Sequence, residues 1–160
     1  MHLVSEINTF SIFATITTTT MIQRIQSVHL GLAALFSGLM FVFPLYSVGE
    51  TSYRITAGAQ YSMVLCMLAG ATIGLPLATI FQYKKRSLQL ILCRINQLLL
   101  AGLLVACVMS LDTVRKASSL MQPDLKMSIF LPILGILLTI LAMRAIKRDD
   151  ALVRSADRIR

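Results

Sequence analysis

The sequence has few charged residues, three cysteines and no tryptophan, and the shortage of charge already narrows the class of protein. Only 14% of the 160 residues are charged, whereas 56% are hydrophobic. In a typical soluble domain, about a quarter of the residues are charged. A chain this apolar does not remain disordered in water, and it has too few polar side chains to cover a globule of its own size. The surplus apolar residues must therefore face something other than water.

The sequence also lacks the residue patterns of metal centres, enzymes and proton-coupled transporters. Cys66, Cys93 and Cys107 have no Cys-x-x-Cys spacing and no nearby histidine. None of the seven acidic residues lies inside an apolar run, although carboxylates within the membrane are the usual mark of proton-coupled transport. The motifs of zinc proteases, serine hydrolases and phosphate-binding loops are absent. We therefore expect no enzymatic activity, no cofactor and no metal.

Four long apolar runs dominate what is present. They cover about 28–46, 61–81, 88–111 and 127–143. At about 1.5 Å per residue, helices of roughly 17–21 residues reach roughly 25–32 Å, which matches the hydrocarbon core of a bilayer. Backbone amides cannot remain unpaired in lipid, so each run predicts a helix. Short connections favour antiparallel neighbours. The predicted fold is all-α, an integral membrane four-helix up-down-up-down bundle over residues 21–146.

The positive charges are distributed unevenly between the two ends of this predicted bundle. Of the 15 Lys and Arg residues, 11 lie near the N-terminus, in the segment 82–94 or after the fourth run, and four lie in the loops 47–60 and 112–126. The positive-inside rule therefore places the N-terminus and the C-terminus in the cytoplasm. Because this topology explains the net charge of +8, we expect the lipid bilayer and no nucleic acid as partner.

The two ends of the chain differ from the apolar runs. Residues 1–20 have neither the basic start nor the apolar core of a signal peptide. We interpret them as a disordered extension or as an over-long start, with Met21 as the true first residue. Residues 147–160 predict a cytoplasmic, basic, amphipathic tail helix. The spacing of Asp150, Arg154 and Asp157 allows ion pairs along that helix.

Three groups of residues are candidates for function. The first is a polar cluster at the cytoplasmic end of the first and third runs, formed by His29, Arg94, Asn96 and Gln97. It predicts either a small pocket for a headgroup, quinone or anion, or an arginine that extends to the interface beside amides that bond neighbouring helices. The second group is a tail at Arg154, Asp157 and Arg158, which either docks on a partner or rests on lipid headgroups.

The third candidate group is a helix contact. Gly70 and Gly74 have the small-xxx-small spacing that lets helix backbones approach closely, either inside the bundle or between two copies of the chain. Pro44, Pro76 and Pro132 are expected to bend their helices. Cys66 and Cys107 share a depth, but thiols in apolar spans usually pack as small residues rather than pair.

Three segments resemble one family. They are MIQRIQ from Met21, LQLILCRIN from Leu88 after a basic turn, and LVRSADRIR from Leu152 to the end. The chain from Met21 onward is similar to a Bacteroidetes family of uncharacterised four-span membrane proteins, domain of unknown function 4293. The resemblance implies a bacterial inner-membrane protein and supplies no catalytic residues. It also implies that the segment 154–158 is a feature of the family, in a place where burial in lipid does not determine the sequence.

These observations favour a non-enzymatic function. The leading hypothesis is an accessory or scaffold subunit of a larger membrane complex, which contacts that complex through its spans and its basic tail, or associates with itself. An alternative is a lipid- or quinone-handling membrane protein with the polar pocket at its cytoplasmic end. A third hypothesis is a small oligomeric transporter, which would need several copies because four helices enclose little free volume.

Overall fold

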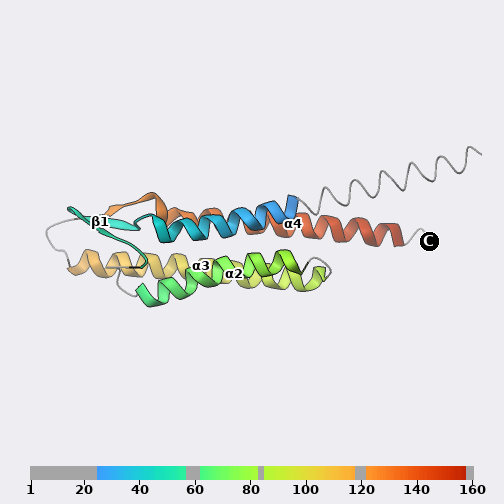
Figure 1. Ribbon diagram of the computed structural model, residues 1–160, viewed down its shortest axis with the longest axis horizontal. Coiled ribbons are helices and arrows are strands. Elements are labelled where there is room, and N and C mark those ends of the chain that lie inside the picture. Colours follow the sequence, from blue (N-terminus) through green and yellow to red (C-terminus); the bar gives the residue numbers. More distant parts are fainter. Residues whose placement is uncertain (1–24, 57–61, 83–84, 118–121, 158–160) are drawn as a thin grey trace, which may run out of the picture.

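Four long helices dominate the computed structural model, which describes residues 25–56, 62–82, 85–117 and 122–157 (Figure 1). The helices are Ile25–Val42, α2 (Ser62–Phe81), α3 (Arg86–Ala117) and α4 (Leu131–Asp157), the last preceded by the 3-10 turn η1 (Met127–Phe130). Each is long and apolar enough to cross a membrane. The prediction of a helical protein with four such helices is confirmed. The predicted extension 1–20 and Met21 lie outside the described residues.

The helix boundaries depart from prediction where proline intervenes. The first helix ends at Val42 and not near residue 46, because Pro44 has no amide hydrogen and disfavours helical backbone in the residue before it. The expectation that three prolines bend helices is therefore wrong for Pro44. Pro132 is the second residue of α4, where a missing amide is tolerated. Only Pro76 lies well inside a described helix.

A three-stranded antiparallel sheet, which the all-α prediction missed, joins the two loops at one end of the bundle (Figure 1). Its strands are β1 (Tyr46–Val48), β2 (Thr51–Tyr53) and β3 (Asp124–Leu125), in the order β2-β1-β3. Gly49 makes the two-residue turn between β1 and β2 with a φ of 58°, a conformation that glycine adopts without a steric cost. The α2–α3 connection and the end of α4 lie at the opposite end of the bundle.

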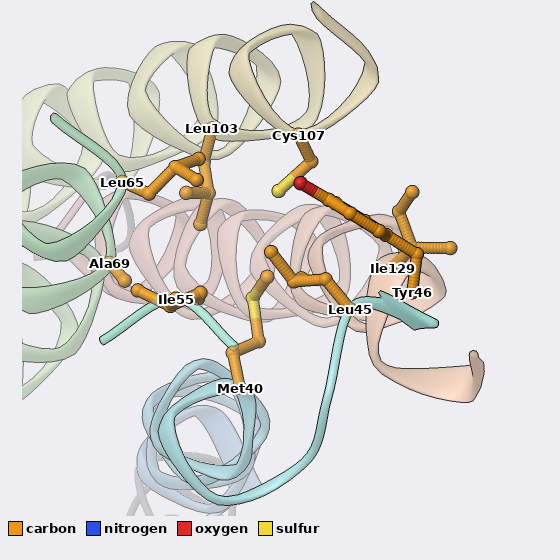
Figure 2. Packing of buried hydrophobic residues seen from close by; sticks show 9 residues of the cluster. All are labelled: Met40, Leu45, Tyr46, Ile55, Leu65, Ala69, Leu103, Cys107 and Ile129. Atoms are coloured by element: carbon orange, nitrogen blue, oxygen red, sulfur yellow. The ribbon is translucent and has the colours of Figure 1, made fainter. Parts of the chain in front are cut away.

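The sheet packs on the bundle through a cluster to which the first helix, α2, α3 and η1 contribute buried residues (Figure 2). The Tyr46 ring stacks on Tyr53 with 5.1 Å between centroids, and its hydroxyl lies 3.0 Å from the Ser110 hydroxyl on α3. The buried members are Met40, Leu45, Tyr46, Ile55, Leu65, Ala69, Leu103, Cys107 and Ile129. Burial of these side chains therefore ties the sheet to the helices.

Inside the bundle, buried residues recur at alternating steps of three and four. In α3 they are Gln89, Cys93, Asn96, Leu100, Leu103, Cys107 and Ser110. Buried positions in α2 and in α4 follow the same steps. This repeat of 3.5 residues per turn is the repeat of left-handed coiled-coil packing.

Three contacts define the register between α3 and α4. Arg86 pairs with Asp149, and Asn96 donates to Thr139. Leu100 lies so close to Gly135 that a Cβ there would be 3.2 Å from its Cδ2. The two residue numbers have the same sum in all three pairs, as expected for antiparallel helices that keep one register over their whole contact.

The close approach at Gly135 generates a stability prediction. We expect Gly135→Leu to lower the free energy of unfolding by about 1–3 kcal/mol, because the new side chain would collide with Leu100. Gly102→Leu is the matched control on α3, since nothing lies within 4 Å of a Cβ built there. Reversible unfolding in mixed detergent micelles measures both. Equal effects of the two substitutions would contradict the close α3–α4 contact.

Candidate functional site

A group of charged side chains lies at the end of the bundle opposite the sheet. Arg86, the first residue of α3, places Nη2 3.0 Å from Oδ2 of Asp149, whose side chain is 7% exposed. Its Nη1 lies 3.9 Å from Asp150, which also pairs with Arg154 at 3.0 Å. These pairs attach the start of α3 to the C-terminal part of α4. The described part of the helix predicted over 147–160, up to Asp157, is the continuation of α4, with no break at residue 146.

Polar side chains line the interior above these ion pairs. Gln89 donates to the carbonyl oxygen of Thr79 at 3.1 Å, which joins α3 to α2. Asn96 donates to the Thr139 hydroxyl at 3.3 Å, which joins α3 to α4. The Thr139 hydroxyl in turn donates to the carbonyl of Gly135. Interhelical bonds of this kind hold membrane helices together, at about 0.6 kcal/mol on average.

Four buried oxygen atoms have no hydrogen-bond partner within the part of the chain that the structure describes. They are Oε1 of Gln26, Oε1 of Gln89, Oδ1 of Asn96 and Oδ1 of Asp149. All four are acceptors, so a water molecule or another donor would satisfy them. Polar side chains are thus buried among the apolar residues of the interior, whereas the outward faces carry large exposed apolar side chains on all four helices.

The predicted polar cluster is divided between different faces of the bundle. Asn96 is 1% exposed and faces α4, whereas Arg94 is exposed and Gln97 is half-buried. His29 bonds through Nδ1 to the carbonyl of Ile25 in its own helix, at 2.7 Å. No hydrogen bond between described residues joins two of these four side chains. Their similar depth along the bundle axis therefore does not bring them to one side of it.

The predicted helix contact at Gly70 and Gly74 faces outward. Both residues are exposed, and nothing lies within 4 Å of a Cβ built at either position. Gly135 is the glycine that α3 approaches closely inside the bundle. Packing inside the bundle, one of the two interpretations of the Gly70–Gly74 spacing, therefore does not hold in the structure. The other interpretation, contact between two copies of the chain, stays a prediction.

The predicted docking tail is described in part. Arg154 forms the expected i,i+4 pair with Asp150 and is 79% exposed. Arg158 and the side chain of Asp157 lie outside the described residues. All three cysteines are free, and Cys66 donates weakly to the carbonyl of Ile55.

Sequence reasoning missed the interior role of Gln26, Gln89 and Asp149. The signal for Gln89 was present in the steps of three and four that lead from it through Cys93 and Asn96. Asp149 was harder to find, because it lies among exposed Lys147 and Arg148 in a polar segment. Its burial depends on Arg86, which is distant in sequence.

These features define a class of protein: a bundle of four long apolar helices with polar side chains buried in an otherwise apolar interior and with one charged end. A family model described as Domain of unknown function (DUF4293) matches residues 22–159. The chain therefore belongs to the DUF4293 family. No curated protein and no solved structure matches it.

The ion pair at the charged end generates a second stability prediction. We expect a double-mutant cycle on Arg86→Ala and Asp149→Ala to give a coupling of about 1–2 kcal/mol, because the carboxylate is almost fully buried. The exposed pair Asp112–Lys116, at 2.6 Å, is the control and should give less than about 0.5 kcal/mol. Unfolding in mixed micelles measures both cycles. A coupling for Arg86–Asp149 as small as the control would mean that this pair does not attach α3 to α4.

Proposed function

We propose that this protein is a non-enzymatic accessory or scaffold subunit of a larger membrane complex. The four helices are proposed to cross a bacterial inner membrane as an up-down-up-down bundle, with both termini in the cytoplasm. Support for the membrane comes from the length and composition of the helices and from the large apolar side chains on their outward faces. The distribution of Lys and Arg supports the orientation. That the protein comes from the Bacteroidetes is part of the same proposal.

One observation carries the proposed scaffold role. The outward face of α2 presents a continuous stripe at steps of three and four. Its members are Met63, Met67, Gly70, Gly74, Leu77 and Phe81. Gly70 and Gly74 lie at the centre of this stripe, and no atom of the described residues lies within 4 Å of a Cβ built at either position. Such a face lets the backbone of a partner helix approach closely, and flexible Met side chains adapt to its surface.

The charged end supports the same role from the cytoplasmic side. α4 continues past the ion pair of Arg86 with Asp149, so its last turns extend beyond the layer that holds the bundle together. Arg154 is exposed there. The transmembrane face of α2 and this helical end together offer two separate contacts to one partner.

The lipid- or quinone-handling alternative, as a pocket of His29, Arg94, Asn96 and Gln97, has less support. Asn96 faces the interior while Arg94 is exposed. A small oligomeric transporter would need several copies of the chain, because four helices enclose little free volume. No observation favours such an assembly.

Photo-crosslinking in native membranes tests the scaffold role. A crosslinking amino acid at Met67, 65% exposed on the α2 stripe, should give one defined adduct with a larger membrane protein. The matched control at Leu98, 74% exposed on α3, should give only lipid or diffuse adducts. We expect Gly70→Leu with Gly74→Leu to reduce the Met67 adduct at least fivefold, because the new side chains prevent a partner helix from approaching closely.

Gly102→Leu is the control substitution, since Gly102 is an outward-facing glycine on α3, and it should leave the adduct unchanged. An adduct between two copies of this chain would replace the accessory role by self-association through the same face. Equal adducts at Met67 and Leu98, or an adduct that survives the double substitution, would contradict the proposal.

A further inference from the structure

An apolar cavity of about 320 Å³ lies between the sheet-side halves of α3 and α4. Leu104, Val108 and Leu111 of α3 and Ile133 of α4 line it, together with residues of β3 and η1. Val108 is 51% exposed and Ile133 is 41% exposed, so the cavity opens on the outward surface of the bundle. In the proposed membrane, this surface faces lipid chains.

Two cations lie on the same surface, toward the charged end. Arg94 precedes Val108 by 14 residues, and Lys147 follows Ile133 by 14 residues. Because the interior repeats every seven residues, residues two repeats apart share one face of a helix. Both cations are exposed, and neither takes part in an ion pair with any residue that the structure describes.

The register of α3 against α4 sets the spacing of these two cations. Arg86 is level with Asp149, so Arg94 and Lys147 differ by six residues in level, or about 9 Å along the axis. Two long side chains can converge on one phosphate over that distance. The acidic residues beside them, Asp149 and Asp150, are already paired with Arg86 and Arg154. The positive charge of Arg94 and Lys147 is therefore not compensated locally.

The apolar length between Arg94 and the cavity matches one leaflet. Ten residues separate Arg94 from Leu104, which corresponds to about 15 Å of helix. Half of a hydrocarbon core is also about 15 Å. A lipid chain that starts beside Arg94 therefore ends at the near edge of the cavity.

We propose that the α3–α4 surface binds one anionic phospholipid of the leaflet at the charged end. Arg94 and Lys147 hold its phosphate, and one acyl chain follows the surface between the two helices to the cavity. This inference rests on the membrane location in the proposed function, but it is independent of the partner on α2.

Spin-labelled lipids in nanodiscs of phosphatidylcholine test this inference. We expect the wild-type chain to immobilise labelled phosphatidylglycerol in preference to labelled phosphatidylcholine. Each cation near an anionic headgroup is worth about fivefold in association. Lys147→Gln alone should therefore lower the preference about fivefold, and Arg94→Gln with Lys147→Gln should abolish it. Arg148→Gln is the matched control, because Arg148 is exposed at the same level but is turned about 100° from Lys147 around α4. It should change the preference less than twofold.

Two results would overturn the inference. One is an equal association of both lipids with the wild-type chain. The other is a loss in Arg148→Gln as large as that in Lys147→Gln, which would indicate general attraction to a basic end. A separate flotation assay with phosphatidylcholine vesicles distinguishes these results from a chain that does not insert into membranes at all. A chain that does not float with vesicles contradicts the proposed function itself, whereas a chain that floats without lipid preference contradicts only the lipid site.

Discussion

The apolar outward faces of the helices are the constraint on which the rest of the structure depends. Leu98 is 74% exposed and Met63 is 71% exposed, and such faces are stable in a solvent of lipid chains rather than in water. In that solvent, polar groups are placed inside the bundle or at its ends. The structure follows this division: Gln89 and Asn96 bond between helices, while Arg86 and Asp149 pair at one end.

The contact of α3 with α4 combines several of these features. One register aligns an ion pair, a hydrogen bond and a close approach at glycine. The same register aligns outward-facing Arg94 and Lys147 with an apolar cavity. Gly70 and Gly74 of α2, like Gly102 of α3, are exposed, and no described atom lies within 4 Å of a Cβ built there. Gly135 thus makes a close contact inside the bundle, whereas Gly70 and Gly74 face outward together on α2, and the proposed function assigns their face to another protein.

The four apolar helices could be predicted because the length and hydropathy of a run are local properties. The sheet could not, because its strands have two or three residues and Ser47 pairs with Asp124, about half of the chain away. The burial of Asp149 likewise depends on a distant arginine. The candidate site was predicted from depth along the axis, which a sequence indicates, whereas the rotation of each helix decides which side chains meet. Asn96 and Arg94 thus share a depth but not a side.

Cysteine accessibility in sealed, right-side-out vesicles tests the proposed membrane arrangement most directly. In a chain without its three native cysteines, single cysteines at Glu50 in the β1–β2 turn, Leu98 on α3 and Arg148 on α4 report on both ends and the middle. All three positions are exposed in the structure. A membrane-impermeant maleimide should label position 50 from outside, position 148 only after the vesicles are opened, and position 98 under neither condition. Labelling of position 98, or of positions 50 and 148 from the same side, would contradict the account.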